Sequence, residues 1–152
     1  MTKSTAPSAF TMFSEGVRKE EGGTLSFIGC ILTTEAIDCD PEFFLPQLRI
    51  TVFLSWPHES PPIGWRVITR FPDGTLSKPF HLPPEAEASK ALEKDEDGRV
   101  SIMFQAISTP FRVKDTGQLA VVLQSDESEE TIGKLCFKRP DPKAKKHPMK
   151  NK

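Results

Sequence analysis

The sequence predicts an all-β protein, an antiparallel β-sandwich of immunoglobulin-like or C2-like form, and two features of the chain support this. Apolar and polar residues alternate with a period of two along several short segments, which is the spacing of side chains on a half-buried strand. The 14 prolines and nine glycines fall mainly between these segments, where they favour turns. We expect seven to eight strands with at most one short helix, arranged as two stacked sheets; a small closed barrel is the alternative.

The N-terminal part of the chain predicts two strands joined by a tight turn. Residues 9–18 are strand-like, with apolar Phe10, Met12 and Phe13. The adjacent glycines at 22 and 23 permit positive φ angles and therefore favour a turn. Residues 24–32 are apolar on both faces, which predicts a central strand that is covered on both sides.

The middle of the chain predicts three more strands. Residues 48–56 alternate most regularly, with a large apolar residue at every second position, a pattern that does not fit a helix. Residues 65–71 are a further strand, and the Pro-Asp-Gly sequence at 72–74 favours a tight turn after it. Residues 75–82 are expected to pair back at the edge of the sheet, because Pro79 lacks an N–H group.

The C-terminal part of the chain predicts one irregular stretch and three strands. Residues 83–98 favour a short surface helix or a loop, since alanine and Leu92 supply most of their apolar content. Strand alternation resumes at residues 99–107 and recurs at 118–124 and 131–138. These three strands complete the expected set.

One domain is the expected organisation. The 152 residues suit a single domain, which we place at residues 9–138, between a disordered polar arm at 1–8 and a basic proline and lysine tail at 139–152. The 20 basic and 21 acidic residues nearly cancel, so the composition does not predict nucleic-acid binding, for which the tail lysines are only a weak signal. No apolar run reaches the ~18 residues of a membrane span. With no signal-peptide pattern at the N-terminus, this predicts a cytoplasmic protein that has no membrane partner.

The three cysteines do not predict a disulfide framework or a zinc site. They lie at positions 30, 39 and 136, an odd number without a Cys-x-x-Cys pair. Cys30 and Cys136 are within apolar segments, so we expect both to be buried.

No sequence motif predicts catalysis or a cofactor. The chain contains no nucleophile elbow, phosphate-binding loop, His-Glu-x-x-His pair or dinucleotide fingerprint. A calcium- or ligand-binding C2-like sandwich is the first alternative, because C2-like sandwiches bind calcium between acidic loops. The acidic groups are Asp38, Asp40 and Glu42; Asp95, Glu96 and Asp97; and Asp126, Glu127, Glu129 and Glu130. An enzyme whose site the sequence does not reveal is the second alternative.

A proline-rich loop between two tryptophans is the candidate partner-binding site. Trp56 and Trp65 bracket this loop, which carries His58 and Ile63, and an exposed tryptophan is a frequent hot spot of protein interfaces. The alternative is that both tryptophans cap the core, because they follow the alternation of the neighbouring strands.

Two blocks near the N-terminus, residues 13–18 (FSEGVR) and 21–29 (EGGTLSFIG), have a distinctive sequence. Together with residues 44–48, 71–74 and 110–117, they resemble a family of small bacterial and phage-associated β-sandwich proteins that is known only as a domain of unknown function. The resemblance spans residues 10–138 and implies a sandwich fold. It implies no chemistry and no catalytic residues.

Protein binding is the expected function. Phe43 and Phe44 are a second candidate binding patch, with a position plugging the end of the sandwich as the alternative. We expect a non-enzymatic interaction module of bacterial or phage origin that binds a protein through loops or an edge strand. Self-pairing of an edge strand into a homodimer is an alternative to a foreign partner.

Overall fold

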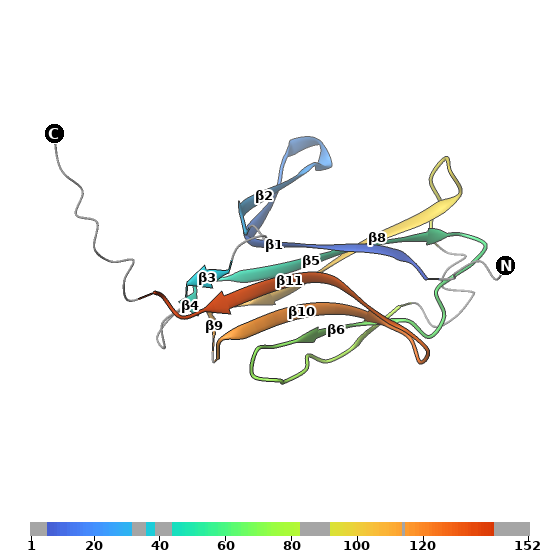
Figure 1. Ribbon diagram of the computed structural model, residues 1–152. Coiled ribbons are helices and arrows are strands. Elements are labelled where there is room, and N and C mark those ends of the chain that lie inside the picture. Colours follow the sequence, from blue (N-terminus) through green and yellow to red (C-terminus); the bar gives the residue numbers. More distant parts are fainter. Residues whose placement is uncertain (1–5, 32–35, 39–43, 83–91, 114, 142–152) are drawn as a thin grey trace.

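The structure is a computed structural model that describes residues 6–31, 36–38, 44–82, 92–113 and 115–141 (Figure 1). Its one helical segment in these ranges is a 3₁₀ turn, Glu21–Gly23. The strands are β1 (Ser8–Lys19), β2 (Leu25–Cys30), β3 (Ile37–Asp38), β4 (Phe44–Leu45), β5 (Leu48–Pro57), β6 (Arg66–Arg70), β7 (Phe80–His81), β8 (Arg99–Ser108), β9 (Phe111–Arg112), β10 (Gly117–Gln124) and β11 (Glu129–Lys138).

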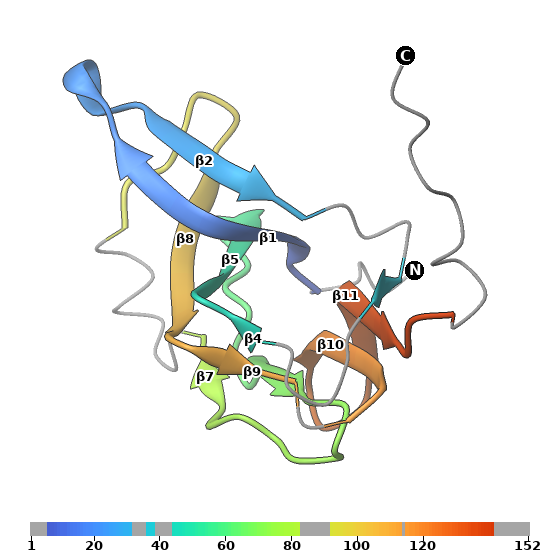
Figure 2. The ribbon, with the colours of Figure 1, turned by 90° about the vertical axis from the view of Figure 1, so that its left-hand side faces the viewer.

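Two sheets packed face to face confirm the predicted β-sandwich (Figures 1 and 2). Sheet A has the strand order β2-β1-β5-β8, and sheet B has the order β3-β11-β10-β6-β7. Neighbouring strands are antiparallel, except that β3 runs parallel to β11. β4 and β9 pair with each other outside both sheets.

The periodicity of the sequence locates the long strands to within two residues. The expected strand at 75–82 is the exception, because only Phe80–His81 forms a ladder with β6 and Leu76 makes an isolated bridge to Arg70. This strand is at the edge of sheet B, as Pro79 predicted. The two-residue strands β3, β4 and β9 are too short to show a period. Residues 1–5, 83–91 and 142–152, for which an arm, a helix or loop and a tail were predicted, lie outside the described residues.

The strand predicted as central, β2, is instead an edge strand of sheet A. Leu25 and Ile28 are 38% and 52% exposed, and Cys30 is exposed rather than buried. Cys136 is half-buried. The β1–β2 hairpin leaves the plane of the sheet and projects from the body of the sandwich (Figures 1 and 2). Apolar residues on both faces of a strand therefore do not mark a covered strand in this protein.

The core lies between the two sheets. β5 lies between β1 and β8, and its inward residues from Leu48 to Trp56 are buried, as the alternation predicted. β10 has the corresponding place in sheet B, where Leu119, Val121 and Leu123 are fully buried. Removal of these side chains from water is the main stabilising contribution to such a fold.

The two sheets approach each other closely on one side of the sandwich. Among the described strands of opposite sheets, β1 and β11 lie close together over the greatest length. Gly133 of β11 faces Thr11 of β1 so closely that a Cβ atom at Gly133 would lie 2.5 Å from the Thr11 Cβ. Only a residue without a side chain fits at this position.

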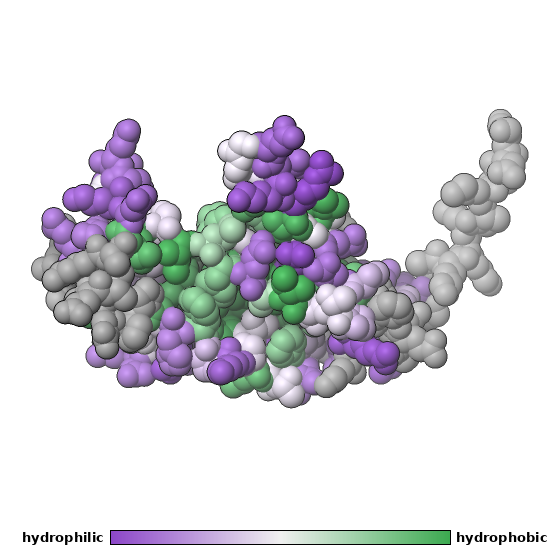
Figure 3. Space-filling view, turned by 180° about the vertical axis from the view of Figure 1, so that it is seen from behind, coloured by the Kyte–Doolittle hydropathy of each residue, from purple (hydrophilic) through white to green (hydrophobic). Residues whose placement is uncertain are grey.

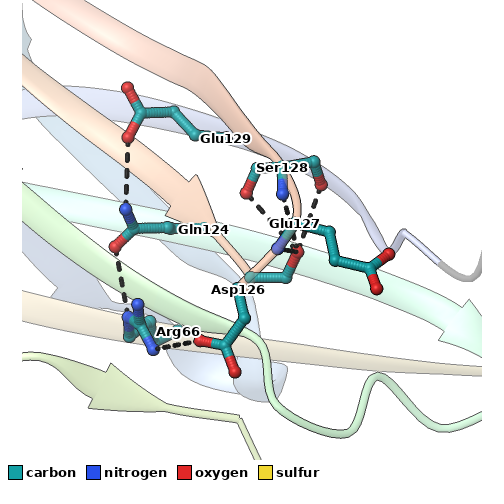
Figure 4. Close-up of polar contacts among 7 residues, drawn as sticks. Arg66, Gln124, Asp126, Glu127, Ser128 and Glu129 are labelled. Atoms are coloured by element: carbon teal, nitrogen blue, oxygen red, sulfur yellow. Dashed lines mark hydrogen bonds and ion pairs between the residues drawn. The ribbon is translucent and has the colours of Figure 1, made fainter.

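Charged and amide side chains cover the free face of sheet B. Arg70 of β6 donates two hydrogen bonds to the Glu129 carboxylate of β11, one of them at 2.9 Å. Gln124 of β10 donates to Glu129 at 3.3 Å and accepts from Arg66 Nε at 3.1 Å (Figure 4). Arg66 also donates to Asp126 at 3.3 Å. These contacts cross three neighbouring strands and give sheet B a polar outer surface.

Replacing Gly133 by alanine should destabilise the fold. The new methyl group would overlap Thr11, and such overpacking costs about 1–3 kcal/mol of the free energy of unfolding. Gly16→Ala is the matched control, because a Cβ atom there would lie 3.8 Å from its nearest neighbour, Ile28 Cβ. The control should leave the free energy of unfolding unchanged or raise it by about 0.5 kcal/mol. Urea denaturation measures the free energy of unfolding of both variants, and equal stability of the two would contradict the close contact.

The Arg70–Glu129 pair should show in the titration of the carboxylate. Hydrogen bonds from Arg70 hold the pKa of Glu129 below its usual value. Desolvation of the carboxylate opposes this shift, and the positive charge of Arg70 adds to it. A lowered folded-state pKa stabilises the protein above the unfolded-state pKa, and this contribution is lost as the pH falls through the folded-state pKa. In Arg70→Gln the pKa of Glu129 should rise, as followed by NMR of the side-chain carboxyl carbon. An unchanged titration, or the same change in the control Lys94→Gln, would refute the pairing.

Candidate functional site

The two tryptophans of the predicted binding site belong to the core. Trp56, in β5, is 0% exposed, and Trp65, just before β6, is 8% exposed. Both lie in the buried cluster that also contains Leu82 and Val100. Their side chains therefore cannot contact a partner in this conformation, which corrects their assignment as binding residues. The physical reason is parity, because both tryptophans continue the inward-facing positions of their strands.

The loop between the tryptophans is folded against the turn before β8. The His58 N–H donates to the Gly98 carbonyl at 3.0 Å, and the Ile63 N–H donates to the Pro61 carbonyl at 2.9 Å. His58 is half-buried, whereas Ile63 is 59% exposed. Ile63 is thus the part of this predicted site that offers a large apolar side chain to solvent.

The second predicted patch is only partly within the described residues. Phe43 lies outside them. Phe44 is in β4, where its backbone pairs with Arg112 of β9. Partner binding by Phe43 and Phe44 therefore stays a prediction.

An exposed apolar patch crosses the free face of sheet A. The strand registers place Phe10 of β1, Phe53 of β5 and Met103 of β8 side by side. The Phe10 and Phe53 rings are stacked with centroids 4.6 Å apart, and the Phe27 ring of β2 lies 6.1 Å from that of Phe53. Phe10 is 56% exposed and Met103 is 40% exposed. We call Phe10, Phe27, Phe53 and Met103 the apolar patch.

Polar rows border the apolar patch on both sides. On one side Arg99 Nε donates a hydrogen bond to Ser55 Oγ at 3.0 Å. On the other side Arg49 donates to the Gln105 side chain at 3.3 Å. An apolar centre with a polar rim is the usual anatomy of a protein interface.

Two charged projections rise on either side of the apolar patch (Figures 1 and 3). One is the tip of the β1–β2 hairpin, where Arg18 and Glu20 form an ion pair at 3.2 Å. The other is the turn before β8, where the Asp95 carboxylate accepts hydrogen bonds from the N–H groups of Asp97 and Arg99. Figure 3 shows hydrophobic side chains on the surface between these hydrophilic projections. Phe10 and Phe53 of the apolar patch line a depression of about 300 Å³ on this face of the molecule.

A cavity of about 630 Å³ opens between the two sheets, lined by β5 and β8 of sheet A and by β6, β7 and β10 of sheet B. Residues 104–108 of β8 line it without a break. Phe80 of β7 and Phe104 of β8 stack across its mouth with ring centroids 4.0 Å apart. Lys78 is the one charged residue among the described lining residues. We call this cavity the side opening.

Sequence reasoning identified neither the apolar patch nor the side opening, although β8 carries a signal for both. The alternation of residues 99–107 predicts one apolar face, which contains Val100 and Phe104. Met103 and Ile107 lie on the opposite face and are 40% and 54% exposed. Large apolar residues on the second face of a strand thus indicated an exposed surface.

The described residues show no assembled metal site and no membrane-crossing helix. No three His, Cys, Asp or Glu side chains among them are grouped so that they could hold a metal ion. Asp40 and Glu42 of the first acidic group lie outside the described residues. No helix in the described ranges has the length and apolar content needed to cross a membrane.

The core position of Trp65 predicts a large loss of stability in Trp65→Ala. Deleting a buried tryptophan side chain costs about 3–5 kcal/mol of the free energy of unfolding. The neighbouring Ile63→Ala should change it by less than about 0.5 kcal/mol, because Ile63 is mostly in solvent. Urea denaturation followed by far-ultraviolet circular dichroism measures both without relying on tryptophan fluorescence. A Trp65→Ala protein as stable as Ile63→Ala would show that Trp65 is not a core residue.

Comparisons with known proteins do not add to this picture. The chain matches no family model, no curated protein and no solved structure. The function is therefore argued from the geometry of the apolar patch and the side opening.

Proposed function

We propose that this protein is a non-enzymatic interaction module that binds a protein partner on the free face of sheet A. The contrast between the two free faces of the sandwich is the observation that supports this most. On sheet B the side chains of Arg70, Glu129 and Gln124 are bound to one another, whereas sheet A exposes the apolar patch. Covering such a patch with a partner removes apolar surface from water and stabilises the complex.

Exposed apolar side chains in the described residues are concentrated in sheet A. Of the eight that are large and exposed, five lie in β1, β2 or β8, and Ile63 is the one in the loop that the sequence favoured. This distribution supports the face of the sheet over the loop as the main contact surface. The five are Phe10, Leu25, Ile28, Met103 and Ile107.

The geometry of the apolar patch suits an interface hot spot. Phe10 and Phe53 are already stacked in the free protein, so their rings lose little freedom when a partner binds. The polar rows and the charged projections around them would exclude water and orient the partner. A second copy of this chain is the alternative partner.

A bacterial or phage-associated origin and a cytoplasmic location belong to the same proposal. The origin is supported by the resemblance at residues 13–18 and 21–29, and these blocks form the hairpin beside the apolar patch. The location is supported by Cys30, a free and exposed thiol, because exposed thiols persist in reducing compartments.

Phe10→Lys and Ile63→Lys distinguish the apolar patch from the loop. Both residues are similarly exposed, at 56% and 59%, so neither change should unfold the protein. The immobilised wild type and the two variants are used to capture proteins from bacterial lysates, and each captured protein is then purified for titration calorimetry. Phe10→Lys should weaken binding by at least about 30-fold, as expected for a hot-spot residue, while Ile63→Lys should bind like the wild type.

Binding that survives Phe10→Lys and fails with Ile63→Lys would contradict the proposal and return the site to the loop. If the Phe10→Lys variant fails to bind because it is unfolded, its melting temperature will be lower than that of the wild type. In that case Met103→Lys, on the same patch and 40% exposed, replaces it.

A further inference from the structure

We infer that the side opening binds an extended segment of another protein, which joins sheet A as a fifth strand along β8. Within the described residues β8 pairs with β5 alone, so one edge of its backbone has no strand partner there. β8 is ten residues long, whereas the other edge strands, β2, β3 and β7, have six, two and two. The longest edge of the sandwich thus borders the opening.

In its own sequence after Arg99, β8 lacks the features by which a strand normally protects its edge. Natural edges are short, or carry charges, prolines or bulges that prevent pairing with another chain. Residues 100–108 contain no charged residue, no proline and no glycine. The facing edge of sheet B, β7, is both short and preceded by Pro79. The sequence therefore protects the edge on one side of the opening and leaves the other able to accept a strand.

The walls of the side opening fit a peptide better than a purely apolar ligand. Apolar residues of both sheets line it, and consecutive residues 104–108 of the edge strand β8 form one wall. An acyl chain would fill the interior but would leave the backbone N–H and C=O groups of β8 without partners. An extended peptide would fill the interior and also pair with the backbone groups of β8, because every second side chain of an added strand enters the opening.

The size and charge of the opening define the kind of segment that fits. Five residues of β8 span about 17 Å at ~3.4 Å per residue, which leaves room for two or three inward side chains of the added strand. Lys78 supplies the one charge among the described lining residues. The segment should therefore alternate apolar and polar residues and carry an acidic residue where it passes Lys78.

This surface is distinct from the apolar patch, although β8 contributes to both. Ala106 lines the side opening from the inward face of β8, is exposed, and lies outside the patch. Phe10 lies in the patch and does not line the opening. Variants at these two positions therefore separate a failure of this inference from a failure of the proposed function.

A library of random ten-residue peptides displayed on yeast tests the inference with the intact protein as bait. Peptides enriched on the wild type should show apolar residues at every second position. Ala106→Lys should weaken their binding by about tenfold or more, because Ala106 is exposed on the inward face of β8 and the charge would point into the opening, whereas Ile63→Lys and Phe10→Lys should not. Lys78→Glu should weaken the acidic peptides by about fivefold. Hydrogen exchange should show new protection of β8 amides when a synthetic enriched peptide is bound.

Several results would overturn the inference. These are the absence of any enriched peptide, enrichment without a period of two, equal binding by Ala106→Lys, or protection confined to other strands. Analytical ultracentrifugation of the free protein covers the alternative of a second copy. A dimer with β8 amides protected in the absence of peptide would show that the edge pairs with itself.

Discussion

The close contact between Gly133 and Thr11 determines where this sandwich is closed and where it is open. It brings β1 and β11 together at one side, and each sheet extends from there as a stiff, twisted layer. The gap on the other side must be filled by side chains, and the inward side chains of β8 that follow Phe104 are small. Phe104 reaches Phe80, but Ala106 and Ser108 beyond it are too short to meet the opposite sheet. The side opening follows from this combination.

The outer surfaces of the two sheets differ because their rows of side chains differ. On sheet B, complementary partners face one another across three strands, and the Arg70–Glu129 pair satisfies both charged groups. On sheet A, the corresponding row brings Phe10 and Phe53 together, and their stacked rings have no polar groups with which to bind each other. Phe10 remains 56% exposed after stacking. The same pairing of neighbouring strands thus gives a polar surface on one face and an exposed apolar surface on the other.

The sequence predicts the fold far better than the site, because the two depend on different information. Alternation within a strand shows which residues share a face, so β5 and its buried Trp56 could be predicted from local spacing. It does not show which strand lies alongside, and β2 is therefore apolar on both faces and yet at an edge. The apolar patch depends on register, since it joins residues 10, 53 and 103 from strands far apart in the chain. Nothing local in the sequence aligns these three positions.

β8 connects the two surfaces, and this connection has a thermodynamic consequence. Its outward residue Met103 belongs to the apolar patch, while its backbone edge and its inward residues form one wall of the side opening. Any partner that changes the position or order of β8 therefore changes both surfaces together. Because linkage is reciprocal, the factor by which one partner alters the affinity of the other is the same in either order of binding. Because β8 contributes to both surfaces, it would couple the two proposed partners over a short distance.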